Sequence, residues 1–287
     1  MEIAVADEVQ TEERKDPTRA GLTKRKWLLR CQAPDGLNFR LIRTQYQEGE
    51  NAFETPRHHH SFQQIRFAEK GMLNYAPDEY IPEGDIAYFP RGAYYGPQHR
   101  DHGIGITVQY GFGTEMLGGT EALEVYRRGV ETLRERGRIE GGVFVDIDPD
   151  TGAERRRDPY EAFVQDIAGE KFAIPEPGYE APILMHPRAY TYFQVTPGVE
   201  IKHLGGFYDH PGPQGDVRIS MVRLSDGGIH PFEADRAQLV WTVEAGLRIA
   251  GRTYPEMTSL YSPRGEEVAL SAEDGVELFV VEFPRLD

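Results

Sequence analysis

Apolar and polar residues alternate in two long parts of the chain, which is the pattern of strands that bury one face. In the C-terminal part the alternation includes Val240, Thr242 and residues 250–254. In the N-terminal part, His58, His60, Phe62 and further alternate residues fall on one face of a strand. We therefore expect a mainly β protein.

The two parts also share a short repeat. Residues 88–92 read YFPRG, and residues 261–265 read YSPRG, each after a stretch of alternating residues. This repetition predicts two copies of one β domain in the chain.

Between the two copies the pattern changes to that of helices. One set of apolar residues recurs with helical spacing: Leu123, Tyr126, Val130 and Leu133. This helix is expected to end near Gly137. A second helix is predicted after Asp158, which can act as the N-cap, because a proline and then a glutamate follow in the first turn. It should stop at Gly169.

The histidines at residues 58–60 carry the clearest chemistry. On a strand, His58, His60 and Gln64 project to one face, and His59 projects to the other. Two neutral imidazoles and an amide oxygen can bind Fe, Ni, Cu, Mn or Zn, and the oxygen donor favours a catalytic site over a closed structural one. The sequence therefore predicts one divalent transition metal bound by these residues.

A fourth ligand is expected near Tyr95. Counting by two from Tyr95 places His99 on the same face of the strand and Gln98 on the other. A bulge at Gly96 and Pro97 would exchange these two side chains. His99 is the expected ligand, and Gln98, Tyr95 and water are the alternatives.

Two segments around these residues resemble the paired signatures of the cupin superfamily. HHHSFQQIRFAEKG has the His-x-His pair and the later Gly71, and GDIAYFPRGAYYGPQH has Gly84 and the Pro-x-Gly turn. Gln64 stands where the family usually has Glu, and Tyr95 stands where it has the closing His. The resemblance implies a bicupin: two barrels, each a jelly-roll or double-stranded β-helix, with a small helical insert between them.

On this basis the chain is divided into four parts. We expect a flexible tail at 1–25, a metal-binding barrel at 26–118, a helical insert and linker at 119–185, and a degenerate C-terminal barrel at 186–287. In the second copy, Leu239 and Val268 stand at the positions of Gln64 and of the closing histidine. Leucine and valine cannot bind metal, so the metal is expected only in the first barrel. The second barrel should serve packing and a homodimer.

The cavity of the first barrel should also bind substrate. Arg66 continues the inward parity of Gln64, and its guanidinium suits a carboxylate or enolate; alternatively, it pairs with an acid at the barrel mouth. Aromatic side chains with polar tips could wall the cavity or fill the core: Tyr75, Tyr88, Tyr94 and Tyr95. We expect Arg66 and the first three tyrosines to bind substrate, and Arg66 and Tyr95 to act in catalysis.

Three functions follow from the resemblance and these residues. The first is a non-haem iron dioxygenase acting on a small phenolic, enol or keto-acid substrate, with Fe(II) favoured over Ni, Mn, Cu or Zn. The second is a metal-dependent isomerase or lyase. The third is a non-catalytic bicupin that binds or senses a small molecule.

Composition narrows the partners. The 287 residues carry a net charge of −15, and no basic stripe suits a nucleic acid. No apolar run is long enough to span a membrane, and the first residues do not form a signal peptide. The single cysteine, Cys31, agrees with a reducing compartment, so we expect a cytoplasmic protein.

Overall fold

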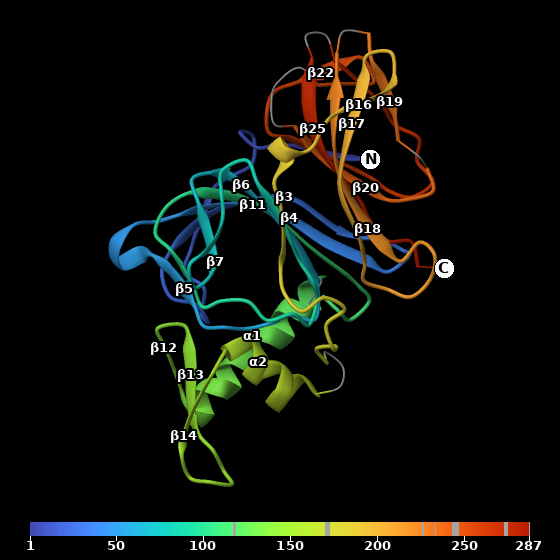
Figure 1. The fold of residues 1–287 in the computed structure, drawn as a ribbon. Coiled ribbons are helices and arrows are strands. Elements are labelled where there is room, and N and C mark those ends of the chain that lie inside the picture. Colours follow the sequence, from blue (N-terminus) through green and yellow to red (C-terminus); the bar gives the residue numbers. More distant parts are fainter. Residues whose placement is uncertain are drawn as a thin grey trace. The chain divides into compact units, whose positions relative to one another are not determined.

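The chain folds into two units (Figure 1). The computed structural model describes residues 1–116, 119–169, 173–225, 227–232, 234–242, 247–272 and 275–286, without the side chains of 119–123. We call Thr11–Leu184 the N-terminal unit, and Met185–Asp287 together with Met1–Gln10 the C-terminal unit. Strands far outnumber helices, so the mainly β fold predicted from the alternation is confirmed.

A seven-stranded sheet in the order β15-β9-β6-β11-β4-β3-β2 organises the N-terminal unit. Two short pairs, β10-β5 and β7-β8, complete it. The strands are β2 (Glu12–Arg14), β3 (Thr23–Gln32), β4 (Leu37–Tyr46), β5 (Phe53–Thr55), β6 (Gln63–Lys70), β7 (Leu73–Ala76), β8 (Glu79–Ile81), β9 (Ile86–Phe89), β10 (Gln98–Arg100), β11 (Ile104–Phe112) and β15 (Ile183–Met185). Strand β6 is buried on both faces from Gln63 to Ala68, so its polar residues lie inside the unit.

The C-terminal unit repeats this arrangement, with a seven-stranded sheet in the order β1-β23-β20-β25-β18-β17-β16 and a four-stranded sheet in the order β19-β24-β21-β22. Its strands are β1 (Glu2–Val5), β16 (Phe193–Thr196), β17 (Val199–Tyr208), β18 (Asp216–Leu224), β19 (Ile229–Pro231), β20 (Gln238–Thr242), β21 (Leu247–Ile249), β22 (Arg252–Tyr254), β23 (Thr258–Ser262), β24 (Ala269–Ala272) and β25 (Val276–Glu282). The YFPRG and YSPRG segments begin on β9 and β23, which hold the same place in the two sheets.

Strand register corrects one position of the expected repeat. Gln64 pairs with Phe89 in the first sheet, and in the second sheet Gln238 pairs with Ser262. Gln238, not Leu239, is therefore the counterpart of Gln64. By the same register Val240 is the counterpart of Arg66, and it belongs to an apolar core cluster. The C-terminal unit thus carries an apolar core residue at the position of Arg66, whereas it keeps a buried glutamine at the position of Gln64.

The flexible tail expected at residues 1–25 is not what the structure shows, because two strands in this range pair with the sheets. Strand β1 pairs with β23 of the C-terminal unit, and β2 pairs with β3 of the N-terminal unit. The physical reason lies in short stretches that fit sheet edges: Ile3 packs against the core of the C-terminal unit, and Val5 is buried. The first residues complete one sheet and then extend the other.

The region predicted as a helical insert contains both predicted helices and also a small sheet. Helix α1 (Gly119–Arg136) ends at Gly137, and helix α2 (Pro159–Phe163) begins at its N-cap Asp158, whose carboxylate accepts hydrogen bonds from two backbone N–H groups. A π-helical turn continues α2 to Ala168. The pattern did not predict the three-stranded sheet of β12 (Arg138–Glu140), β13 (Val143–Ile147) and β14 (Glu154–Arg157).

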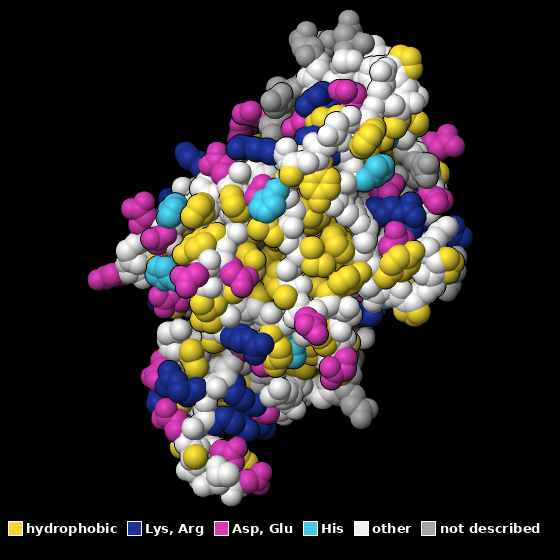
Figure 2. Space-filling model, viewed as in Figure 1, with side chains coloured by type: hydrophobic (Ala, Val, Ile, Leu, Met, Phe, Trp, Pro, Cys, Tyr) yellow, Lys and Arg dark blue, Asp and Glu magenta, His cyan; other side chains and the backbone are white. Residues whose placement is uncertain are grey.

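Basic side chains gather on the insert, around β14, in the view of Figure 2. Arg138, Arg155 and Arg156 of this region form ion pairs with nearby acids, so their charge is compensated within the insert.

None of the described helices is long and apolar enough to cross a membrane.

Candidate functional site

The histidines at residues 58–60 divide between two sides, as the alternation predicted. His58 and His60 line a pocket in the N-terminal unit, with ring centroids 5.0 Å apart. His59 turns away, where its Nδ1 lies 3.0 Å from the carbonyl oxygen of Gly92 and its backbone N–H donates to Glu161. Burial holds the pKa of His58 and His60 well below the usual value, so both imidazoles are neutral.

Gln64, Arg66 and Tyr95 form a hydrogen-bonded group inside the same pocket. The guanidinium of Arg66 donates to Gln64 Oε1 from Nε at 3.1 Å and from Nη2 at 2.9 Å. Nη2 also lies 3.0 Å from the Tyr95 hydroxyl, which accepts from Gln64 Nε2 at 2.8 Å. The alternative that placed Arg66 at the barrel mouth beside an acid such as Glu69 is wrong, because Arg66 is buried and Glu69 pairs with Arg43.

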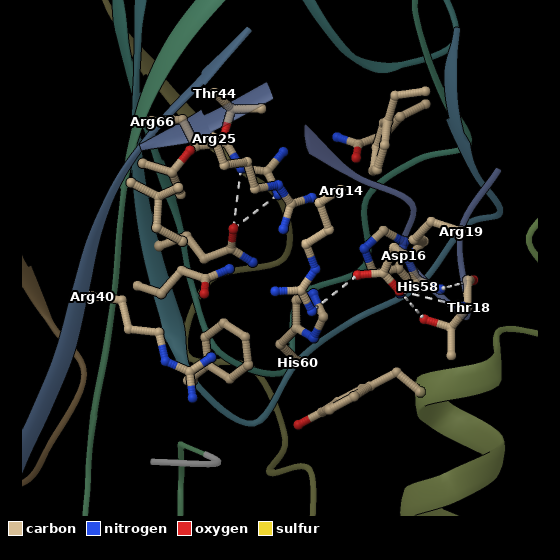
Figure 3. Close-up of a pocket in the computed structure, with 18 of the residues that line it drawn as sticks. Arg14, Asp16, Thr18, Arg19, Arg25, Arg40, Thr44, His58, His60 and Arg66 are labelled. Atoms are coloured by element: carbon tan, nitrogen blue, oxygen red, sulfur yellow. Dashed lines mark hydrogen bonds and ion pairs between the residues drawn. The ribbon is translucent and has the colours of Figure 1, made fainter. Parts of the chain in front are cut away.

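Arginine dominates the lining of this pocket, which encloses about 250 Å³. Seven arginines contribute, from strands far apart in the sequence: Arg14, Arg19, Arg25, Arg30, Arg40, Arg66 and Arg100. Among the described residues only one carboxylate, that of Asp16, lines the pocket with them. Figure 3 shows Arg66 and Arg25 together at one side of the pocket and Arg40 apart from them. A chain with a net charge of −15 therefore encloses a strongly positive cavity.

Arg100 joins Arg66 in the inner part of the pocket. It is buried, and it donates to the backbone oxygen of Asn74 and to the hydroxyl of Tyr46. In the amide orientation that satisfies its neighbours, Gln98 Oε1 accepts from Arg66 at 2.8 Å and from Arg100 at 3.0 Å. Both guanidiniums thus meet neutral acceptors, which satisfy hydrogen bonds without balancing charge.

The pKa values of the lining residues record this excess of positive charge. Burial lowers the pKa of Arg66, and burial together with the guanidiniums of Arg30 and Arg14 lowers the pKa of Arg40 to about 10. Burial alone would raise the pKa of the Tyr46 hydroxyl, but Arg100 and other nearby guanidiniums outweigh it and lower that pKa. A bound anion would relieve each of these shifts.

A segment before β3 closes one side of the pocket and ties it to the insert. Arg19 forms a buried ion pair with Asp158 at 2.6 Å, and the Thr18 hydroxyl lies 2.9 Å from the hydroxyl of Tyr126 on α1. Thr18, Arg19 and Tyr126 all line the pocket. The insert therefore helps to shape the site.

The prediction of His99 as an inward ligand is wrong. His99 is exposed and its Nδ1 lies 3.0 Å from a carboxylate oxygen of Glu54, whereas Gln98 is buried and lines the pocket. Counting by two fails because the chain is not one strand here. Tyr95 forms an isolated bridge, Gly96 adopts a positive φ of 92°, and β10 starts afresh at Gln98.

Three of the four predicted tyrosines do not line the pocket. Tyr75 is buried in an apolar cluster, Tyr88 is fully buried near Tyr179, and Tyr94 stacks on His59. They fill the core or cover its outside, because both faces of this sheet are packed. Tyr95 does line the pocket.

Sequence reasoning missed the arginines of β3 and β4. Their signal was present, because Arg40, Ile42, Thr44 and Tyr46 alternate along β4 and all line the pocket. An alternating strand does not say which of its faces is enclosed, and an arginine is ordinarily assigned to the solvent face.

The donors present do not complete the four-ligand metal centre that the sequence predicted. Of the four predicted ligands, only His58 and His60 place an imidazole inside the pocket. His99 lies outside it, and the oxygen of Gln64 already accepts two hydrogen bonds from Arg66. No group of three or more His, Cys, Asp or Glu side chains suited to a metal occurs among the described residues. A guanidinium beside the remaining pair would also repel a cation.

Comparison with known proteins identifies the class of fold. The chain has a bicupin fold. It is similar over 99% of its length to a presumed dioxygenase from Nostoc punctiforme PCC 73102, with a TM-score of 0.61, 10% identity and coverage of 82% of that chain. It is also similar over 99% of its length to oxalate decarboxylase from Bacillus subtilis, described with Mn(II) centres, with a TM-score of 0.53, 11% identity and coverage of 78% of that chain. No model of a known protein family matches the chain, and no curated protein does.

Glu161 makes the stability of the N-terminal unit depend on pH. Burial and the nearby Asp158 raise the pKa of Glu161 from 4.5 to about 7. As pH rises from 4.5 to 7, the unfolded chain releases this proton before the folded protein does, so the folded state loses stability. The contribution is fully present below pH 4.5. Glu161→Gln should remove this loss and make the variant the more stable protein above pH 7, as measured by urea unfolding across that range. Parallel stability profiles for the two proteins would contradict the assignment.

Proposed function

We propose that the N-terminal unit binds a small organic anion, such as a carboxylate, in the arginine-lined pocket. One observation carries the proposal: the buried guanidiniums of Arg66 and Arg100 form no ion pair with a carboxylate anywhere in the described part of the chain. A buried charge is costly unless an opposite charge accompanies it. An anionic ligand supplies that charge.

The chemistry of the lining suits such a ligand. Guanidinium groups bind carboxylates through paired, charge-assisted hydrogen bonds. The one lining carboxylate, Asp16, accepts from the backbone N–H and the hydroxyl of Thr18, and lies 3.8 Å from Arg14, so it does not reach the inner pair. The fold is shared with oxalate decarboxylase, an enzyme named for a small organic anion.

Calorimetry on the purified full-length protein tests the proposal. We expect small carboxylates to bind in the presence of a metal chelator, with an affinity that falls as salt is added, because salt screens the arginine charges. The same anions should raise the midpoint of thermal unfolding. Wild-type protein that binds no carboxylate under these conditions would refute the proposed function.

The iron dioxygenase expected from the sequence is the second candidate. The neutral pair of His58 and His60, held 5.0 Å apart in the pocket, favours it, as does the fold shared with a presumed dioxygenase. Stoichiometric iron after purification without chelators, lost in the His58→Ala/His60→Ala variant, together with oxygen consumption, would support it. Bound metal without oxygen consumption would support the isomerase or lyase instead.

A further inference from the structure

Two arginines face each other across neighbouring strands in the outer part of the pocket. Arg30 on β3 and Arg40 on β4 are direct partners in the strand register, and both line the pocket. Like charges directly opposite each other on one face of a sheet are destabilising. This pair therefore signals a place where an anion belongs.

The surroundings hold these two guanidiniums in position. The guanidinium carbon of Arg30 lies 4.1 Å from the centroid of Trp27, and the Trp27 Nε1–H donates to Glu12. Arg40 pairs in register with Gln109 on β11, which also lines the pocket and adds an amide. The contact with Trp27 already restricts the side chain of Arg30, so this side chain loses less conformational entropy when a ligand binds.

This outer group is separate from the inner arginines. Along β4, Arg40 is followed by Ile42 and then Thr44, which line the same pocket. Ile42 is in register with Thr107, which in turn pairs with Arg66, and Thr44 pairs with Arg25. Arg66 thus lies two residues and Arg25 four residues further along the strands than Arg40, or about 7 and 13 Å at the rise of a strand.

The lining between the two groups is mainly uncharged. Trp27 and Ile42 pair in register across β3 and β4, and Phe62 also lines the pocket. Such side chains contact the carbon skeleton of a ligand rather than its charges. In Figure 3 Arg40 likewise lies apart from Arg66 and Arg25.

We infer that the pocket binds an elongated organic dianion, with one anionic group at Arg66 and Arg100 and the other at Arg30 and Arg40. This inference rests on the proposed function and specifies its ligand class. The apolar middle of the ligand lies against Trp27 and Ile42. A very short dianion such as oxalate cannot reach both groups, whereas adipate or suberate can. Besides burial, the guanidinium of Arg30 contributes to the lowered pKa of Arg40, which agrees with the two being neighbours.

Calorimetry with matched acids tests the two-group pocket. The probes are the diacids oxalate, succinate, adipate and suberate. Succinate is compared with butyrate, adipate with hexanoate and suberate with octanoate, which are the monoacids of equal length. Adipate or suberate should bind at least about tenfold more tightly than its monoacid, since a second charge-assisted contact is of that size. Oxalate should gain no such advantage over butyrate.

Two variants locate the outer group. Arg30→Gln and Arg40→Gln should each weaken adipate binding toward that of hexanoate and leave hexanoate binding unchanged. Arg30 is exposed, so Arg30→Gln should fold normally even if Arg40→Gln does not. Arg43 lies on β4 with Arg40 and forms an ion pair with Glu69 on β6, so Arg43→Gln is the control and should change neither affinity.

The outcomes separate this inference from the proposed function. If adipate and hexanoate bind wild-type protein equally, or if the Arg30 variant weakens both equally, the two-group pocket is wrong while anion binding stands. If no acid binds, both are wrong.

Discussion

Replacing Arg66 by methionine is expected to weaken carboxylate binding by about 10- to 150-fold, the equivalent of one charge-assisted contact of about 1.5–3 kcal/mol. The same change should stabilise the protein without ligand by about 1 kcal/mol, within the usual range for relief of a functional strain. The reason is that burial lowers the pKa of Arg66, so folding disfavours its charge. Calorimetry and urea unfolding in a buffer without carboxylates measure the two effects.

Arg43→Met is the matched control, because Arg43 lies on β4 and is paired with Glu69. It should leave carboxylate binding unchanged and should not stabilise the protein. If the Arg66→Met variant binds carboxylates as tightly as wild type does, Arg66 is not part of the binding site. A variant that is less stable than wild type would instead show that its hydrogen bonds to Gln64 and Tyr95 outweigh the cost of its charge.

Arg66→Met is expected to weaken ligand binding and to raise the stability of the protein without ligand. Both effects follow from the buried positive charge that this pocket carries. Val240, the counterpart of Arg66 in the second sheet, lies in an apolar cluster and carries no such cost. The chain therefore contains two versions of one sheet, of which one is optimised for packing. The other keeps arginine charge inside, and the binding function proposed above would explain why that charge is retained.

Local patterns predicted the parts of the site that lie on one continuous stretch. Alternation was enough to place His58, His60, Gln64 and Arg66 on one face, because β6 and the residues just before it follow a period of two. It failed at His99, where Gly96 interrupts the strand. Parity held through residues 59–62, which lie outside β6, but it did not hold past the positive φ of Gly96.

The arginine lining could not be predicted because it depends on contacts between distant segments. Arg25 and Arg40 come from β3 and β4, Arg66 from β6 and Arg100 from β10, and only the order of strands in the sheets brings them together. A resemblance built on the histidines also drew attention to a metal. The charge of the pocket becomes visible only when all of its walls are considered at once.

The buried ion pair between Arg19 and Asp158 is expected to make a large contribution to the stability of the N-terminal unit. The Asp158 side chain is fully buried and Arg19 nearly so. Asp158 also caps α2, accepting from the backbone N–H groups of Tyr160 and Glu161. Asparagine caps a helix as well as aspartate does, so Asp158→Asn removes the charge and keeps the cap.

Asp158→Asn should therefore cost about 3–5 kcal/mol, the usual loss when one partner of a buried pair is removed, and Asp158→Ala about 1 kcal/mol more. Arg19→Met should cost a similar amount, because it leaves the buried carboxylate of Asp158 without its ion-pair partner. The double variant Arg19→Met/Asp158→Asn should recover most of the loss, because no buried charge then lacks its partner. Urea unfolding of the wild type, the Arg19→Met and Asp158→Asn single variants and the double variant measures the coupling between the two residues. If the two single losses simply add in the double variant, Arg19 and Asp158 act independently and the segment that carries Arg19 is held over the pocket by its other contacts, such as that of Thr18 with Tyr126.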